Sequence, residues 1–263
     1  VPNQFTAEKP FIERDIAFTR KAYGLDRVKE QVIPAVEVVT GKDMAEDRET
    51  IQNIRLWDWP QLGAVYDAKQ ALKTYYRFRL PEYATFTTAD YNIDVDRYRI
   101  ENAGRQVMVA PRELYTDGLP QQARTWVNLR LQYTHGYGVV MSPVNRVDPE
   151  GLPEYYLGQM PVVSTRPELQ LDRPQIYYGE KPAPYVFVRT SVKEFDYPLG
   201  DSNSRTVYDG KGGVGIGSLL RRVAFAIRFR DSRILFTDVF TPESRVLFVR
   251  SVTERLHAVA PFL

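Results

Sequence analysis

Hydrophobic and polar positions follow a helical period at both ends of the chain and a strand period in the middle. Apolar residues recur at helical spacing over 12–23, with Pro10 near the start and Gly24 where a helix-ending glycine belongs. The same spacing predicts a second helix over 60–77, and one or two shorter helices over 40–55. The first third of the chain is therefore predicted to be helical.

The pattern changes in the middle of the sequence. Residues 91–100 alternate, and a turn at 102–104 leads into 105–110, which together predict a β-hairpin. A helix is expected over 120–133. Prolines then crowd into 143–184, which favours irregular, extended backbone with short edge strands.

The last part combines strand and helix signals. Residues 185–195 (YVFVRTSVKEF) predict one long strand, 205–208 can pair with it, and two helices close the sequence. Strands joined by short turns favour antiparallel pairing. We therefore predict an α+β fold with helices at both ends, a largely antiparallel central sheet and a proline-rich irregular segment. One domain is expected over 1–263, with a helical part over about 1–80 and a mixed remainder over 81–263.

Composition narrows the function classes. A hydrophobic content of 43% and a charged content of 26% are those of a globular protein. A net charge of +2 gives no overall attraction to nucleic acid, although arginine outnumbers acidic residues twofold over 218–263. Cysteine is absent, which excludes thiol catalysis, zinc-thiolate sites and disulfides. No apolar run is long enough for a membrane helix, and the start at Val1 without a signal-like segment leads us to expect an excised fragment.

A glycine-rich stretch over 209–222 (DGKGGVGIGSLLRR) first suggests phosphate binding. Gly210, Gly212 and Gly215 satisfy G-x-G-x-x-G, but the residues before them are polar, whereas a dinucleotide fingerprint follows a buried strand. The stretch is also similar to the KGGVGK[ST] loop of partitioning-type ATPases. Ile216 and Gly217 replace the lysine and the hydroxyl that bind phosphate and magnesium there. No nucleotide cofactor is therefore expected, and no other cofactor is predicted.

Two interpretations of this glycine loop remain. It can be a tight turn in which glycines permit positive φ or close packing, which is the favoured interpretation, or its N–H groups can receive an anion. In both interpretations a helix begins at Ser218. The apolar stripe of this helix is expected to face the core, while Arg221 and Arg228 face outward. The stripe consists of Leu219, Leu220, Val223, Ala226 and Ile227. The residues of the anion-binding or structural loop are Gly210, Lys211, Gly212, Gly213, Gly215, Gly217, Ser218 and Arg222.

The weak candidates for catalysis are a histidine and two carboxylates. His135 stands between a predicted helix and a glycine-hinged loop, where it can act as a general base or simply bond the backbone. Glu194 and Asp196 share one face of a predicted strand, as an acid/base pair or calcium ligands would. The same spacing arises on a solvent-facing strand, which is the favoured interpretation. His257 is expected on the surface of the last helix. No complete catalytic motif accompanies these residues, so no catalytic residue and no metal site is assigned.

Several short strings in order resemble an uncharacterised (UPF-type) family of large bacterial integral membrane proteins. The match runs over nearly the whole chain, although 80–92 fits the pattern less well. The strings are 8–13 (EKPFIE), 19–25 (TRKAYGL), 53–58 (NIRLWD), 94–98 (DVDRY), 122–126 (QARTW), 133–145 (YTHGYGVVMSPVN), 192–198 (VKEFDYP), 210–214 (GKGGV), 217–222 (GSLLRR), 241–245 (TPESR) and 260–263 (APFL).

The resemblance implies location more than activity. Members of such a family carry several N-terminal membrane-spanning helices followed by a large extracytoplasmic portion, and this chain resembles the first part of that portion. The expected location is the extracytoplasmic side of a bacterial cell membrane. The expected partners are the membrane-embedded rest of the same chain and other envelope proteins or further copies, with no nucleic acid. No established activity, and hence no catalytic residue, follows from the resemblance.

Two functions stay open at this point. The first is a non-catalytic extracytoplasmic domain that serves assembly, interaction or ligand sensing at the cell envelope. The second is an envelope hydrolase acting on glycan or another anionic polymer, which would use His135, Glu194 and Asp196 together with the many aromatic side chains. A deep cleft that joins these three residues would favour the enzyme, and scattered positions would favour the interaction domain.

Overall fold

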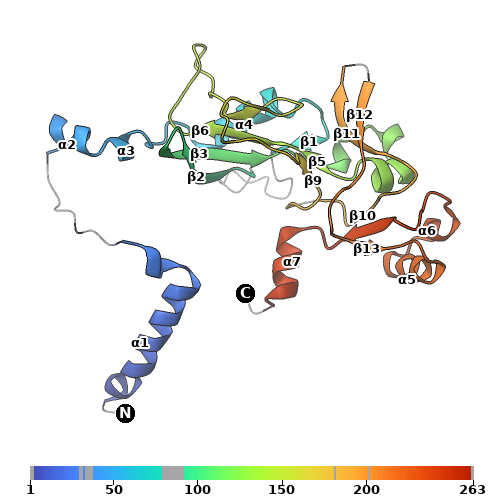
Figure 1. Ribbon diagram of the computed structural model, residues 1–263, viewed down its shortest axis with the longest axis horizontal. Helices are drawn as coiled ribbons and strands as arrows, with labels where there is room; N and C mark the ends of the chain where they lie inside the picture. Colours follow the sequence, from blue (N-terminus) through green and yellow to red (C-terminus); the bar gives the residue numbers. More distant parts are fainter. Residues whose placement is uncertain are drawn as a thin grey trace. The chain divides into compact units, whose positions relative to one another are not determined.

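The computed structural model describes residues 3–29, 32, 38–78, 92–180, 182–200 and 202–261 (Figure 1). Segment 79–91 lies outside the described residues. It includes residue 91, where the predicted hairpin begins, and almost all of 80–92, the stretch that fits the family pattern less well. The chain divides into two units, Val1–Glu46 and Asp47–Leu263. Each unit is described by itself, and the single domain over 1–263 stays a prediction.

The first unit holds the predicted N-terminal helix. Helix α1 (Gln4–Ala22) is followed by Gly24 at φ 66°, and the Gly24 N–H donates to the carbonyl of Lys21. This left-handed glycine ends the helix as the sequence predicts. Pro10 lies inside α1 instead of at its first turn. A 3₁₀ turn, η1 (Leu25–Arg27), and helix α2 (Gly41–Glu46) complete the described elements of this unit.

The second unit begins with α3 (Arg48–Ile51) and α4 (Trp59–Lys69). Together with α2, α3 confirms the short helices expected over 40–55. The carboxylate of Asp58 caps α4 by accepting from the Trp59 N–H at 3.0 Å. Helix α4 stops well before residue 77, which corrects the predicted length. Leu72 adopts a left-handed φ of 65°, and β1 (Tyr76–Arg77) pairs with β4 (Glu113–Leu114).

A five-stranded antiparallel sheet is built around the predicted hairpin. Its first turn consists of Glu101 and Asn102, both at positive φ, which is the turn that matches the natural twist of two strands. Leu62 and Tyr66 of α4 pack on buried residues of this sheet. In spatial order the strands are β2 (Asp94–Ile100), β3 (Ala103–Pro111), β6 (Val139–Pro143), β7 (Leu157–Gly158) and β8 (Val163–Ser164).

The helix predicted over 120–133 is broken into short turns, which are η4 (Gln121–Ala123) and the π turn η5 (Asn128–Gln132), after a 3₁₀ turn η3 (Thr116–Gly118). The Arg124 guanidinium donates to the carbonyls of Leu119 and Asp117. The Asn128 amide donates to the Ala123 carbonyl at 2.8 Å. These side chains occupy backbone acceptors and so compete with a continuous helical ladder.

The strand predicted over 185–195 is in fact two strands in two sheets. Arg189 at φ 55° separates β10 (Tyr185–Val188) from β11 (Glu194–Leu199). Strand β10 pairs with β14 (Arg245–Phe248), which also pairs with β13 (Val214–Gly215). Strand β11 pairs with β12 (Ser202–Thr206), and β5 (Gly136–Tyr137) pairs with β9 (Gln175–Ile176).

Helix α5 (Leu219–Phe229) confirms the helix after Ser218 but presents a different face to the core. Phe225, Ala226 and Phe229 pack inward, and the Phe229 ring stacks on Tyr185 at 4.0 Å. The predicted apolar stripe, apart from Ala226, faces solvent, with Leu220 82% exposed. Two further helices, α6 (Arg233–Phe236) and α7 (Val252–Val259), end the described chain, and His257 is exposed on α7 as predicted.

The fold class is α+β, as the sequence predicts. Helices lie near both ends of the chain, and every pair of described strands is antiparallel. One detail differs, because the described strands form five separate sheets and not one central sheet. Residues 143–184 hold only two-residue strands after β6, which matches the irregular segment expected from the prolines.

Candidate functional site

The two carboxylates singled out in the sequence lie on β11. Alternation along a strand places residues i and i+2 on one face, so Glu194 and Asp196 point the same way. That face is buried, with Glu194 2% exposed and Asp196 7% exposed. The favoured interpretation of a solvent-facing pair is therefore wrong. Two acidic groups in the interior need partners, because burying an unpaired charge is costly.

His135 meets both carboxylates. It follows η5 and precedes β5, and its exposed fraction is 1%. Its Nε2 lies 3.4 Å from Oδ1 of Asp196, and its Nδ1 lies 3.6 Å from Oε2 of Glu194. The structure thus brings His135 to the two candidate carboxylates, which follow it about sixty positions later in the sequence.

Thr134 connects the histidine to Glu194 by hydrogen bonds. Its hydroxyl donates to Oε2 of Glu194 at 2.6 Å and lies 2.8 Å from Nδ1 of His135. A threonine hydroxyl has one proton to give. With that proton given to Glu194, Nδ1 of His135 carries its own proton and donates to the hydroxyl. The other ring nitrogen can then donate to Asp196 in the charged imidazolium.

The charge on His135 follows from these contacts. Burial by itself lowers the pKa of His135, but hydrogen bonds and negative charge from Asp196 and Glu194 outweigh it and raise the pKa above its ordinary 6.5. The cluster therefore favours a protonated histidine between two carboxylates. We call Thr134, His135, Glu194 and Asp196 the buried cluster.

Residues that the sequence did not single out satisfy the rest of this cluster. Glu194 also accepts from the Tyr177 hydroxyl at 2.8 Å and from the Tyr208 N–H at 3.0 Å. Asp196 also accepts from the Gln175 amide at 3.0 Å. Each carboxylate thus has more than one donor, which is the condition for burying charge without a large penalty.

Arg250 holds the backbone around the cluster. Its guanidinium donates to the carbonyls of Tyr177 at 2.8 Å, Ala183 at 3.1 Å and Thr134 at 2.5 Å. Burial lowers the pKa of Arg250 to about 10, so it stays charged at neutral pH. Val249, at φ 49°, takes a conformation that β-branched residues rarely adopt, just before this arginine. Both residues lie between β14 and α7.

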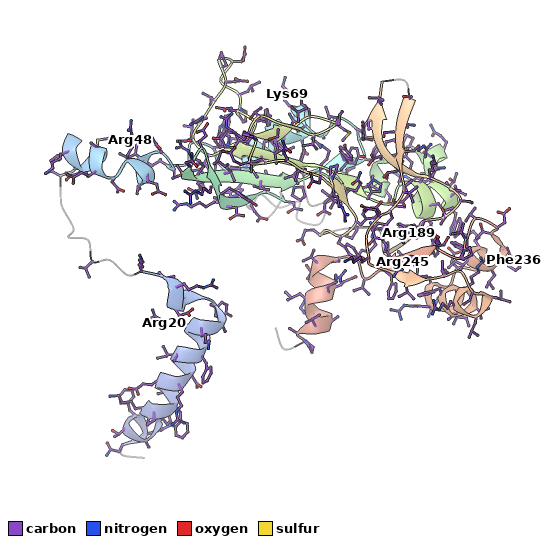
Figure 2. All side chains as sticks on the ribbon, viewed as in Figure 1. Arg20, Arg48, Lys69, Arg189, Phe236 and Arg245 are labelled. Carbon is purple, nitrogen blue, oxygen red and sulfur yellow. The ribbon has the colours of Figure 1, made fainter. Side chains whose placement is uncertain are left out.

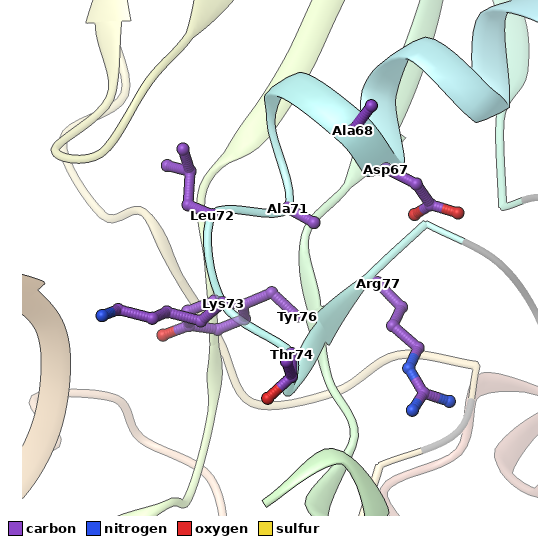
Figure 3. Close-up of a pocket in the computed structure, with 8 residues that line it drawn as sticks. All are labelled: Asp67, Ala68, Ala71, Leu72, Lys73, Thr74, Tyr76 and Arg77. Carbon is purple, nitrogen blue, oxygen red and sulfur yellow. The ribbon is translucent and has the colours of Figure 1, made fainter.

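The buried cluster has little room for a substrate. A neighbouring internal cavity, lined in part by Gly136 and Arg250, has a volume of about 10 Å³, enough for about one water molecule. A hollow of about 800 Å³ lies elsewhere, lined from the end of α4 through β1 (Figure 3). Tyr76 lines this hollow, while its hydroxyl donates to the Asp196 carbonyl at 3.3 Å. His135 and the two carboxylates do not line either space.

Metal ligation requires several donors around one point. Among the described residues, no group of three or more histidine, aspartate or glutamate side chains is arranged to hold a metal ion. The four residues of the buried cluster are linked to one another by hydrogen bonds instead.

The glycine loop is connected to the same interior through Tyr208. The Gly212 N–H donates to the Tyr208 hydroxyl at 3.0 Å, while the Tyr208 ring lies 4.7 Å from that of Tyr177. Part of the loop is β13, an edge strand on β14. The guanidinium of Arg245 donates to the carbonyls of Gly212 at 2.8 Å and Gly213 at 2.7 Å. Figure 2 labels Arg245 and Arg189, the second of which donates to the Gly210 carbonyl at 3.1 Å.

The loop therefore presents carbonyl groups to arginines over much of its length. Arg222 donates to the carbonyls of Ile216 and Phe240, and the Ile216 N–H donates to Ser244. Ser218 is the N-cap residue of α5 but makes no side-chain cap, and Lys211 is exposed. These contacts favour the structural interpretation, since several of the groups that an anion would need are engaged within the chain. Both interpretations stay predictions.

Comparison with known proteins adds the family. The model of an uncharacterised protein family, UPF0182, matches residues 1–263. The chain belongs to the UPF0182 family. UPF0182 proteins of Desulforamulus reducens, Pelotomaculum thermopropionicum and Trichodesmium erythraeum are 46%, 45% and 41% identical to it, over its whole length. No solved structure matches the chain.

The family that the sequence predicts is thus confirmed. The comparison also shows how much of its relatives the chain covers. The chain spans 27% of the length of each of these three UPF0182 relatives, so it corresponds to part of a larger bacterial protein. No helix in the described part of the chain has the length and apolar character that crossing a bilayer requires. The membrane context that the resemblance implies stays a prediction.

Proposed function

We propose that this chain is a non-catalytic extracytoplasmic domain of a bacterial membrane protein and that it serves assembly or interaction at the cell envelope. The observation that carries the non-catalytic part is the closure of the buried cluster. Thr134 and His135 are 0% and 1% exposed, and they line neither the small cavity beside the cluster nor the larger hollow. A general base must come within hydrogen-bond reach of its substrate, and both ring nitrogens of this imidazole face buried groups of the chain, Thr134 and Asp196.

The cluster serves the fold under this proposal. It connects strand β11 to the segment after η5 and to the segment around β9, which are themselves paired through β5 and β9. Fully satisfied polar networks of this kind make a core more specific and more rigid. A domain with such an interior can present fixed surfaces to a partner. The length of the UPF0182 relatives makes the rest of the same polypeptide the first partner to consider.

The envelope hydrolase remains the second candidate, because one observation favours it. His135, Glu194 and Asp196 do come together, at 3.4 Å and 3.6 Å. An enzyme would need these three residues to meet in a deep cleft. They do meet, but they do not line either of the spaces described above. The hydrolase would require the cluster to open, and its residues would then be held for reactivity and not for stability.

The location is tested by cysteine labelling in cells that make the whole protein. These 263 residues have no cysteine, so in a whole protein whose cysteines outside them are replaced, Asn203→Cys on the exposed β11–β12 hairpin gives a single thiol. A membrane-impermeant maleimide is expected to label it in intact cells. Ser142→Cys, at a position with 0% exposure, is the matched control and is expected to react only after denaturation. Labelling of Asn203→Cys only after lysis would place the domain in the cytoplasm and overturn the proposed location.

A further inference from the structure

Helix α5 carries an apolar strip that no described part of the chain covers. Leu219, Leu220 and Ile227 are 70%, 82% and 73% exposed. The opposite face of the helix is occupied, because Phe225 and Phe229 pack on Phe248 and Tyr185. The strip is thus a second apolar face, in addition to the one that holds the helix on the sheet.

A neighbouring helix carries one more exposed apolar side chain. Helix α6 contacts α5, and its Phe236 is 85% exposed while Ile234 is buried. Figure 2 shows Phe236 at the periphery of the second unit. Single exposed apolar residues are ordinary on protein surfaces, but aliphatic and aromatic tips gathered on two contacting helices mark an interaction surface.

The charge along α5 itself is of one sign. Between Asp209 and Asp231 the chain has no acidic residue, and it contains Lys211, Arg221, Arg222, Arg228 and Arg230. Arg221 and Arg228 are exposed on α5, between the strip and Phe225 at the edge of the buried face. The Arg228 guanidinium lies 5.0 Å from the Phe248 ring centre, and the residue is exposed.

We infer that this surface docks on an anionic phospholipid membrane, with Leu219, Leu220, Ile227 and Phe236 entering the headgroup region. A helix with leucine and phenylalanine on one face and arginines beside them is typical of helices that lie in a membrane interface. The arginines complement the lipid phosphates. The setting in the cell rests on the proposed function, whereas vesicle binding does not.

The test places an environment-sensitive NBD fluorophore on the strip. Leu220→Cys gives the cysteine-free 263-residue chain one attachment point at a side chain that packs on little else. Vesicles of phosphatidylglycerol and phosphatidylcholine are expected to shift the emission to the blue, and vesicles of phosphatidylcholine alone are not. Leu199→Cys, at a leucine 54% exposed on β11, is the matched control and is expected to keep the emission of a probe in water.

The role of charge is tested in the same labelled chain. Arg221→Gln with Arg228→Gln is expected to weaken vesicle affinity about tenfold or more, since each basic side chain near an anionic surface contributes separately. Arg48→Gln with Arg99→Gln removes two exposed arginines elsewhere and is expected to leave the affinity unchanged. Raising the salt concentration is expected to weaken vesicle affinity, as Arg221→Gln with Arg228→Gln does.

Three results would overturn the inference. In the first, the probe at position 220 keeps its aqueous emission when phosphatidylglycerol vesicles are added. In the second, replacing the two α5 arginines leaves vesicle affinity unchanged. In the third, the emission shifts when the chain is concentrated without vesicles, which would make the strip an interface between copies. Each of these leaves the cysteine-labelling result on location intact, so the two proposals fail separately.

Discussion

The Nε2 atom of His135 lies 3.4 Å from Oδ1 of Asp196, and both side chains are buried. The second ring nitrogen lies beside the Thr134 hydroxyl, which donates to Glu194. An ionisable group held in this way ties its protonation to folding. A group placed for catalysis would instead need a route to a substrate.

The first prediction concerns pH. The pKa of His135 is raised above its ordinary 6.5 by the two carboxylates, against the effect of burial, so the folded chain binds this proton more tightly than the unfolded chain does. The resulting stabilisation is fully present below the unfolded pKa and is lost as pH rises through the folded pKa. We expect the free energy of unfolding, measured with denaturant, to fall as the pH rises from below 6.5 through the higher pKa of the folded chain.

His135→Gln removes the titrating group and is expected to remove that fall. His257→Gln changes the exposed histidine on α7 and is expected to preserve it. If the curves for the wild type and His135→Gln run parallel across the range, the histidine does not link protonation to folding.

The second prediction concerns the glycine loop, where close packing differs from position to position. Gly213 has φ 83°, and an added Cβ would lie 2.5 Å from a Leu247 methyl and 2.8 Å from the Val246 carbonyl. Gly213→Ala is expected to lower the free energy of unfolding by about 1 kcal/mol or more. At Gly215 the added Cβ would meet only the mobile end of Arg221, at 2.9 Å. Gly215→Ala is therefore the matched control, with a small expected effect in a thermal melt.

Gly217 is a second position where an added Cβ would be too close to its neighbours, although its φ is not positive. Its added Cβ would lie 2.8 Å and 2.9 Å from backbone atoms of Pro242, which cannot move as a side chain can. Gly217→Ala is expected to lower the melting temperature together with Gly213→Ala. A loop that serves only as a linker would tolerate all three alanines.

The third prediction concerns Asp231, which joins α5 and α6 to the core. Its carboxylate accepts from Trp126 Nε1 at 2.6 Å, from the Tyr185 hydroxyl at 2.8 Å and from Arg233 at 2.9 Å. Burial raises the pKa of Asp231, but hydrogen bonds from Arg233, Tyr185 and Trp126 outweigh it and lower the pKa. The stabilisation is therefore present above the unfolded pKa and is lost as pH falls through the folded pKa.

Asp231→Asn is expected to cost about 1–3 kcal/mol of unfolding free energy at neutral pH, because a buried donor loses its charged acceptor. Asp238→Asn, at an exposed position a few residues on, is the matched control and is expected to have little effect. Equal stability of the two variants would show that the contacts of Asp231 contribute nothing measurable.

Local patterns predicted much of the fold but little of its interior. The alternation around Phe195 correctly placed Glu194 and Asp196 on one strand face. The pattern could not show that this face is buried, since the partners Thr134, His135 and Tyr177 are distant in sequence. Only the long-range packing brings them to the carboxylates.

Helix α5 shows a different kind of failure. Its aliphatic stripe has the period of a core-facing surface, so the sequence assigned that stripe to the interior. Phe225 and Phe229 stack with each other at 5.5 Å and join Tyr185 and Phe248, which decides the buried face. A helix with two apolar faces does not reveal from its period which of them its own domain covers.

The sharpest test of a structural role for the buried cluster is the unfolding free energy of Glu194→Gln. The glutamine keeps the shape but presents an amide NH₂ where the carboxylate accepts from Thr134, Tyr177 or the Tyr208 N–H. We expect a loss of about 1–3 kcal/mol, against little change for Glu243→Gln at an exposed position. Residues held for reactivity often cost stability, so their replacement leaves a fold unchanged or more stable. An unchanged or increased free energy of unfolding in Glu194→Gln would contradict the structural role and favour the enzyme.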